Sequence, residues 1–313
     1  MSRLRAAVIG CGHFGRYHAD KYAAAPEVEL VGVVDADRRA AEAVAAAVGC
    51  AAAGELAELA GRVDVASVVV PTHAHLEVAR TCLEAGLHIL VEKPVAATAV
   101  EARAMIDAAA AAGRILQVGH LERFNPAITA LGDVIDRPMF VESTRIAPFK
   151  PRGTDVDVIL DLMIHDIDLI QHLIDAPLAS VDAIGVPVLS RRDDIANARL
   201  HFVGGCVVNV TASRVSLKSE RKMRLFQREA YISIDFQARH ATIARRGQGE
   251  MFPGVPDVRI EQRRFEAHDA LALEIEAFLA AVRGERPVAV TGEDGLRALQ
   301  TAEAITSAML RPV

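Results

Sequence analysis

Acidic residues and a histidine interrupt an apolar run near the middle of the chain, DLMIHDIDLI at residues 161–170. Neither Gly nor Pro occurs from Asp155 to Ile174, so the spacing of apolar residues predicts a helix. Four titratable side chains would share one stripe of it: Asp161, His165, Asp168 and His172. The stripe has three interpretations: a solvated face, a metal site, or an acid–base pair in which a carboxylate orients an imidazole. Between Gly153 and Ser190 there is no Lys or Arg, which is unusual for a solvated face.

A glycine-rich loop, GCGHFG, follows the first apolar run and has the spacing G-x-G-x-x-G. In a strand–loop–helix context, Gly10 permits a tight turn, Gly12 a close approach to pyrophosphate, and Gly15 close helix packing. His13 and Phe14 complete the loop and are predicted to line the same cofactor site. The loop therefore predicts a dinucleotide cofactor.

The choice of dinucleotide is predicted from Asp35, which ends the second apolar run about 20 residues after the loop. Its carboxylate can accept the ribose hydroxyls and would repel a 2′-phosphate, which favours NAD over NADP. Arg38 follows closely and keeps the alternative open, because a guanidinium can bind a 2′-phosphate.

Two further strands end in residues with chemical potential. HILVEKP ends in Glu92 and Lys93, and a lysine at the carboxyl end of a strand can donate to a substrate oxygen. VVVPTHAH places Pro71, Thr72 and His75 at the same edge, near the expected nicotinamide. The alternatives are a surface lysine at position 93 and a helix start at position 75.

The elements that carry these residues fall into two patterns. Short apolar runs alternate with Ala-rich helical segments over the first 120 residues, which predicts a parallel sheet covered on both faces, as in a Rossmann domain. After Phe124 a helix is expected at residues 126–135 and a strand near 139–147. Several alternating runs then predict a large, mostly antiparallel sheet, and two helices close the chain. We place the domains at residues 1–122 and 123–313, the second being α+β.

Composition limits the classes of function. The chain has 313 residues, of which 24% are charged, an ordinary proportion for a globular protein. Its formal net charge of −6 argues against nucleic acid as a partner, because phosphate binding needs a basic surface. Its four cysteines are scattered, without the spacing of a disulfide framework or a zinc site. No signal peptide begins the sequence, and no apolar run is long enough to cross a membrane. We expect a cytoplasmic protein.

Six motifs occur in the order known from one family: VIGCGHFG, VVDADRRAA, VVVPTHAHLEVA, LVEKPVA, VGHLERFNPA and DLMIHDIDLI. The chain resembles the glucose–fructose oxidoreductase, inositol dehydrogenase and MocA (Gfo/Idh/MocA) family over essentially its whole length. The resemblance implies a Rossmann domain followed by an α/β domain whose sheet often forms a homo-oligomer. It also implies NAD-linked oxidation of a CH–OH group by a catalytic set of Lys93, Asp161 and His165, without a metal.

Within that family, PFKPRGTDVDVILDLMIHDIDLI resembles the branch of UDP-N-acetylglucosamine 3-dehydrogenases of lipid A biosynthesis, whose product goes to a partner aminotransferase. Cations flank the predicted helix and suit a diphosphate. The expected substrate-binding residues are Arg123, Asn125, Lys150, Arg152 and Asp168. Two alternatives remain open: a dehydrogenase of inositol or a simple sugar, and a non-catalytic nucleotide-sensing regulator.

Overall fold

The computed structural model describes residues 3–150 and 157–309. The chain divides into two compact units, the first made of the residues up to Leu121 with Asp269–Leu299, and the second of Glu122–His268 with the residues from Gln300. The division expected from sequence, 1–122 and 123–313, assigned the whole second part to one domain. The difference arises because helix α7 (Ala270–Val282) adds its apolar side chains to the core of the first unit.

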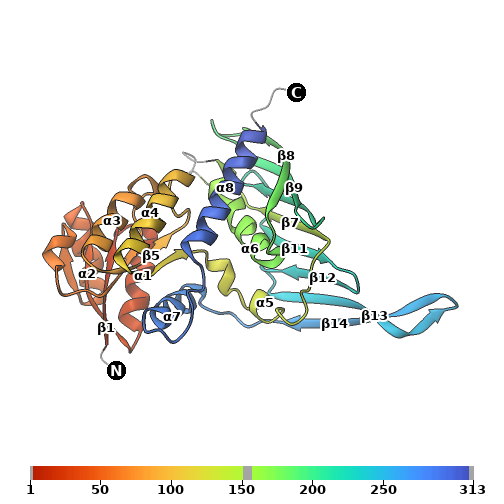
Figure 1. The fold of residues 1–313 in the computed structure, drawn as a ribbon, viewed down its shortest axis with the longest axis horizontal. Helices are drawn as coiled ribbons and strands as arrows, with labels where there is room; N and C mark the ends of the chain where they lie inside the picture. The colour runs from red at the N-terminus through yellow and green to blue at the C-terminus, as the bar shows by residue number, and fades with distance from the viewer. Residues whose placement is uncertain (1–2, 151–156, 310–313) are drawn as a thin grey trace. The chain divides into compact units, whose positions relative to one another are not determined.

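A six-stranded parallel sheet forms the centre of the first unit, in the order β3-β2-β1-β4-β5-β6 (Figure 1). Its strands are β1 (Leu4–Ile9), β2 (Val28–Val34), β3 (Ala51–Ala53), β4 (Val65–Val68), β5 (His88–Glu92) and β6 (Leu116–Gly119). Its helices are α1 (His13–Ala24), α2 (Arg38–Val48), α3 (His75–Glu84), α4 (Ala99–Ala112) and the short 3₁₀ helices η1 (Leu56–Leu59) and η2 (Thr72–Ala74). The predicted Rossmann domain is confirmed. Because the strand order reverses between β1 and β4, a ligand crevice is expected at their carboxyl ends.

An eight-stranded sheet forms the second unit, in the order β14-β13-β12-β11-β7-β10-β9-β8. Its strands are β7 (Phe140–Ile146), β8 (Leu178–Val186), β9 (Ile195–Phe202), β10 (Val207–Ser213), β11 (Glu220–Phe226), β12 (Ala230–Asp235), β13 (His240–Phe252) and β14 (Val255–Arg264). β7 and β10 pair in parallel, and the other neighbouring strands pair antiparallel. The predicted mostly antiparallel sheet is therefore confirmed.

The second unit has short helical turns and two longer helices. They are η3 (Leu121–Phe124), α5 (Pro126–Thr129), the π-helical turn η4 (Ile159–Met163) and α6 (Ile164–Ile174), and α8 (Gly292–Met309) contributes to both units. The helix expected at 126–135 ends at Thr129, after which the chain continues in turns that include Gly132, a poor helix former. The strand expected near 139–147 is confirmed as β7.

One face of the large sheet is buried and the other is not. Along β10 the side chains alternate, with Val208 and Val210 fully buried and the residues between them partly exposed. The buried face lies under α6, whose Ile164, Ile167 and Ile170 have no exposed surface (Figure 1). Burying each such side chain contributes roughly 1.5–3 kcal/mol, so this layer anchors the helix that carries His165.

No described helix is long and apolar enough to cross a membrane.

Glu274 on α7 is an unusual member of the first unit's core. Its side chain is fully buried, and its carboxyl oxygens have no hydrogen-bond partner among the described residues. Burial, and to a lesser extent the charge of Glu92, raises the pKa of Glu274 well above its ordinary value. The carboxyl group therefore keeps its proton to a higher pH in the folded protein than in the unfolded chain.

Replacing Glu274 with Gln should flatten the pH dependence of stability. The stability of the natural protein is greatest below the carboxyl pKa of the unfolded chain and falls as pH rises toward the folded-state pKa, by up to about 1.4 kcal/mol per pH unit. Glu274→Gln removes this loss, so its free energy of unfolding should fall less between pH 5 and pH 8. Denaturant titrations at each pH measure the two slopes, and equal slopes would contradict a neutral buried Glu274.

Candidate active site

The glycine loop between β1 and α1 has the shape of a phosphate cradle. Gly10 has φ +100°, and a Cβ there would lie 2.4 Å from the carbonyl oxygen of Val69. A Cβ on Gly15 would lie 1.8 Å from the carbonyl oxygen of Gly10. At Gly12 a Cβ would meet nothing within 4 Å. Gly10 and Gly15 are thus needed for the fold of the loop itself, and Gly12 leaves open space at the start of α1.

The groups around this space suit a dinucleotide. No side chain caps α1, so its first N–H groups and its dipole are directed at the open space. The N–H groups of Cys11 and Asp37 donate to the two oxygens of Asp35, at 2.7 and 2.8 Å. Each oxygen keeps a lone pair for a ribose hydroxyl. The residues present therefore fit the pyrophosphate and adenosine ribose of NAD.

The other predicted cofactor residues lie mostly at the surface of the first unit. His13 and Phe14 are exposed, and their rings pack edge to face at 5.6 Å. Arg38 is exposed and pairs at 3.4 Å with a glutamate one turn along α2. Pro71 and Thr72 begin the 3₁₀ helix that follows β4, Pro71 exposed and Thr72 half-buried. Their contacts with the cofactor stay predictions.

His75 has a different environment. Its ring is buried, with Nδ1 3.0 Å from the carbonyl oxygen of Pro94 and Nε2 2.9 Å from that of Val70. Burial lowers the pKa of His75, although both carbonyls act in the opposite direction. The ring thus links the loops that follow β4 and β5, which favours a structural role at the start of α3 over direct cofactor contact.

The turn Glu92-Lys93-Pro94 follows β5, with a cis peptide bond before the proline. The Oε2 atom of Glu92 accepts the N–H of Lys93 at 3.2 Å, and Oε1 lies 3.0 Å from Nε2 of His18. Burial opposes ionisation of Glu92, but the hydrogen bond with His18 and the charges of His18 and Lys93 outweigh it and lower the pKa. An ionised carboxylate therefore fixes the backbone of Lys93.

The run DLMIHDIDLI forms the π-helical turn η4 followed by α6. Asp161 lies in the π turn and His165 in the first turn of α6, both half-buried. Such π-helical turns are rare in proteins overall, but many of those that occur lie at functional sites. Along the predicted stripe Asp168 is buried and His172 is exposed, although both lie in the regular helix α6. A solvated face therefore does not describe Asp168.

A buried arginine on the large sheet holds the first turn of α6. Arg145 on β7 donates to Asp166 and, at 3.0 Å, to Glu122, and Ser143 donates to Asp166 at 2.7 Å. Burial opposes the charge of Arg145, but the two carboxylates outweigh it and raise its pKa. Asp166 is the neighbour of His165, so this cluster fixes the backbone that presents the histidine.

Three of the predicted substrate residues, Arg123, Asn125 and Asp168, are already engaged inside the second unit. Arg123 donates twice to Asp168, at 2.7 and 2.8 Å, and both side chains are buried. Asn125 caps α5. Lys150 is exposed. Arg152 lies outside the described residues. Binding of a diphosphate by these residues stays a prediction.

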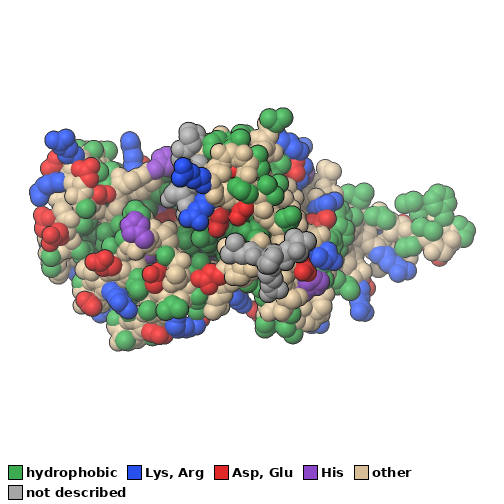
Figure 2. Space-filling view, turned by 90° about the horizontal axis from the view of Figure 1, so that it is seen from above, with side chains coloured by type: hydrophobic (Ala, Val, Ile, Leu, Met, Phe, Trp, Pro, Cys, Tyr) green, Lys and Arg blue, Asp and Glu red, His purple; other side chains and the backbone are tan. Residues whose placement is uncertain are grey.

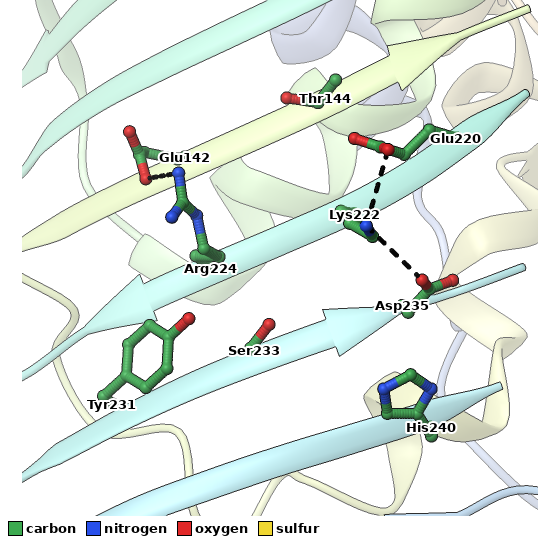
Figure 3. Close-up of a pocket in the computed structure, with 9 residues that line it drawn as sticks. All are labelled: Glu142, Thr144, Glu220, Lys222, Arg224, Tyr231, Ser233, Asp235 and His240. Carbon is green, nitrogen blue, oxygen red and sulfur yellow. Dashed lines mark ion pairs between the residues drawn. The ribbon is translucent and has the colours of Figure 1, made fainter. Parts of the chain in front are cut away.

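A hollow of about 460 Å³ lies on the outer face of the large sheet (Figure 3). It is lined by Glu142, Thr144, Glu220, Lys222, Arg224, Tyr231, Ser233, Asp235 and His240. Glu142 and Thr144 alternate along β7 with Ser143 and Arg145, which contact α6. The hollow therefore opens away from the helix that carries His165, and its cations pair with its own carboxylates.

Metal binding was one interpretation of the acidic run. Within residues 3–150 and 157–309, no three or more His, Cys, Asp or Glu side chains are grouped in a way that could hold a metal ion.

Sequence reasoning missed several buried polar residues. His18 and Tyr22 on α1 and Ser67 on β4 are fully buried, as are Asp166 and its partner Arg145. The signal was present for the first three. A serine interrupts the apolar strand VDVASVVV, and two polar residues spaced i, i+4 fall on the face of a helix that must cover a sheet.

Comparisons with known proteins agree along the chain. A model described as an oxidoreductase family with an NAD-binding Rossmann fold matches residues 4–120. A second, described as the C-terminal alpha/beta domain of an oxidoreductase family, matches residues 150–311. UDP-N-acetylglucosamine 3-dehydrogenase of Acidithiobacillus ferrooxidans is 42% identical over 96% of both chains. Inositol 2-dehydrogenase of Rhizobium meliloti is 27% identical over 96% of this chain and 95% of its own.

Solved structures give the same result. A crystal structure of the Acidithiobacillus ferrooxidans UDP-N-acetylglucosamine 3-dehydrogenase superposes with a TM-score of 0.92, at 39% identity, over 99% of this chain and 100% of that chain. The resemblance inferred from motifs is confirmed over both domains. The chain belongs to the Gfo/Idh/MocA family of oxidoreductases, and its first domain is an NAD-binding Rossmann domain.

Proposed function

We propose that this protein is an NAD-dependent sugar dehydrogenase that oxidises the 3-hydroxyl of UDP-N-acetylglucosamine. The observation that carries the proposal is the 42% identity to an enzyme with that name over 96% of both chains. An inositol 2-dehydrogenase of nearly equal coverage is only 27% identical. Lys93, Asp161 and His165 are all present, which supports a catalyst rather than a non-catalytic nucleotide sensor.

The roles of the catalytic residues follow from the chemistry of alcohol oxidation. His165 accepts the proton of the sugar hydroxyl, and Asp161 orients its imidazole. Lys93 donates a hydrogen bond to the same oxygen and stabilises its developing negative charge. NAD, when bound, supplies the acceptor for the hydride that leaves the carbon. The product is a 3-keto sugar nucleotide, which suits a partner aminotransferase as the next enzyme.

Diphosphate recognition is assigned to the cations before the π turn. Lys150 is exposed, and Arg152 follows it closely in the sequence. Arg123 and Asp168 neutralise each other, so we assign them, with Asn125, to holding the substrate-side backbone rather than to binding charge directly. The net charge of −6 makes a local cation pair necessary, because the protein as a whole repels phosphate.

Turnover tests the proposal. NADH should form with UDP-N-acetylglucosamine when the ketone is trapped or passed to an aminotransferase. Lys93→Met and His165→Ala should each lower kcat by about 10²–10⁴-fold, the usual contribution of acid–base catalysis. NAD affinity, measured by fluorescence titration, should change little.

His172→Ala is the matched control, since His172 lies on the same helix and is exposed. It should keep near-normal kcat. NADH formation with free inositol or glucose, and never with a UDP-sugar even with trapping, would replace the proposal with a cyclitol or simple-sugar dehydrogenase. No turnover with any sugar would favour a nucleotide-sensing regulator.

Cofactor choice gives a second test, because two backbone N–H groups, one of them in the glycine loop, hold the carboxylate of Asp35 in place. The natural protein should bind NAD more tightly than NADP. Asp35→Ser should reduce that preference by about tenfold or more, equivalent to about 1.4 kcal/mol. Asp37→Ser is the control, since serine also caps α2 and should leave the preference unchanged. Equal affinity of the natural protein for both cofactors would refute the assignment.

A reducing compartment fits the cysteines. All four are free: Cys11, Cys50, Cys82 and Cys206. Disulfides are rare in the cytoplasm, and a nucleotide-sugar substrate is consistent with that location. We therefore propose that the enzyme works in the cytoplasm.

We further propose that copies of the chain associate through the outer face of the large sheet. No described helix of this unit covers that face, and its β13–β14 hairpin extends beyond the core with both faces exposed (Figure 1). Apolar side chains gather on the hairpin (Figure 2), with Phe252 64% and Ile260 67% exposed. A second copy of the same sheet would cover them.

Charged substitutions on the hairpin should weaken this association. The double variant Val258→Glu, Ile260→Glu places two carboxylates on neighbouring positions of one strand face. Light scattering after size exclusion should show a lower mass than for the natural protein at micromolar concentration. Val100→Glu, on an 80% exposed residue of the first unit, is the control and should keep the natural mass. A monomeric natural protein would contradict the proposal.

A further inference from the structure

A continuous polar chain crosses the core of the first unit and ends at Lys93. The Tyr22 hydroxyl lies 3.0 Å from Oγ of Ser67, which lies 3.1 Å from Nδ1 of His18. Nε2 of His18 lies 3.0 Å from Oε1 of Glu92, and Oε2 of Glu92 accepts the Lys93 N–H at 3.2 Å. The first three side chains are fully buried. They connect α1 and β4 to the turn after β5.

The hydrogens of this chain can be assigned from its two ends. Burial raises the pKa of Tyr22, although Ser67 acts against the shift, so the phenol keeps its proton. At the other end Glu92 is ionised and can only accept. In a neutral imidazole the carboxylate selects the tautomer with hydrogen on Nε2. With His18 neutral, Tyr22 donates to Ser67, Ser67 donates to Nδ1 of His18, and Nε2 of His18 donates to Glu92. With His18 protonated, Nε2 still donates to Glu92, so the contact with the carboxylate is the same in both charge states.

Space around the carboxylate is restricted from the neighbouring strand. A Cβ on Gly119 of β6 would lie 3.2 Å from the carboxyl carbon of Glu92. The Glu92 side chain is only 13% exposed, toward a cavity of about 270 Å³ that Phe14 and Tyr17 also line. The carboxylate thus has a close wall on one side and His18 on another. Its second oxygen, Oε2, accepts the backbone N–H of Lys93.

We propose that His18 is a positioning residue for Lys93, which it holds through the Glu92 carboxylate from a ring fixed by Ser67. The proposal rests on the proposed function for the catalytic role of Lys93, but the contact chain itself lies wholly in the first unit. A histidine is suited to this position because its two ring nitrogens reach Ser67 and Glu92 at the same time. Leucine would fill similar space without either hydrogen bond.

Removal of His18 should release the turn. Burial alone favours the protonated form of Glu92, and the hydrogen bond from His18 is the leading effect that opposes it. Without that bond, Glu92 can take up a proton or rotate. Either change weakens its bond to the Lys93 N–H and frees the lysine backbone. A misplacement of about 1 Å costs up to roughly 10²-fold in rate.

The test compares His18→Leu with His18→Gln, whose amide N–H can replace the donor to Glu92. His18→Leu should lower kcat by about 10- to 100-fold, with KM and the Kd for NAD within about threefold of their natural values. His18→Gln should recover a large part of kcat. Hydrogen exchange followed by mass spectrometry should show faster exchange in the peptide covering residues 90–96 of His18→Leu. Pro94 has no amide, so Lys93 contributes the amide that Glu92 protects.

His88→Leu is the matched control, because His88 belongs to the same unit and its Nδ1 accepts a backbone N–H outside this chain. It should leave kcat and exchange of the 90–96 peptide unchanged. Unchanged exchange in folded His18→Leu would overturn the proposal, as would a His18→Gln variant no better than His18→Leu. If circular dichroism shows that His18→Leu is unfolded, Ser67→Ala is tested instead. It should lower kcat and speed hydrogen exchange of the 90–96 peptide, and no change in either would overturn the proposal.

The two proposals fail differently. If Lys93→Met keeps normal turnover, the catalytic role of Lys93 is wrong, whereas faster exchange in His18→Leu still supports the positioning of its backbone. If Lys93→Met is inactive and His18→Leu exchanges like the natural protein, the catalytic role stands and the positioning by His18 is wrong.

Discussion

The second unit depends on a buried guanidinium shared by two carboxylates. Arg145 reaches Asp166 on α6 and Glu122 at the beginning of the unit, so one side chain from the sheet connects both. Removing one partner of such a group leaves an uncompensated buried charge, which costs about 3–5 kcal/mol. The cluster therefore tolerates little change in geometry. Because His165 directly precedes Asp166 in the helix, its backbone position is constrained by the same contacts.

The first unit holds two carboxyl groups whose pKa values shift in opposite directions. Glu92 and Glu274 both lie in its interior, and the charge of Glu92 raises the pKa of Glu274. Glu92 has His18 and the Lys93 backbone as partners and remains ionised. The carboxyl oxygens of Glu274 have none among the described residues, and its pKa is raised. The difference lies in hydrogen bonding, because desolvation acts on both groups in the same direction.

The fold was largely readable from sequence, since alternating apolar runs and glycine spacing are local signals. The position of Asp35 just after β2 and beside the glycine loop could also be predicted, because its distance from that loop is fixed by one βαβ unit. The pairings of Arg145 and Arg123 were not, since they join residues that only the tertiary structure brings together. The same holds for α7, because no local sequence pattern shows that this helix packs in the core of the first unit. The π turn at Asp161 was not predicted, because the spacing of apolar residues cannot distinguish it from an ordinary α-helical turn.

Cys11 lies inside the glycine loop, between Gly10 and Gly12, yet its side chain is buried and only 8% exposed. Burial, with a smaller effect from the Asp35 charge, raises the pKa of the thiol to about 12. Oxidants and alkylating agents react with thiolates, and at neutral pH this thiol forms almost none. The loop can therefore keep a cysteine beside the site of a redox cofactor without a reactive sulfur, so peroxide or iodoacetamide should modify Cys11 only after the protein unfolds.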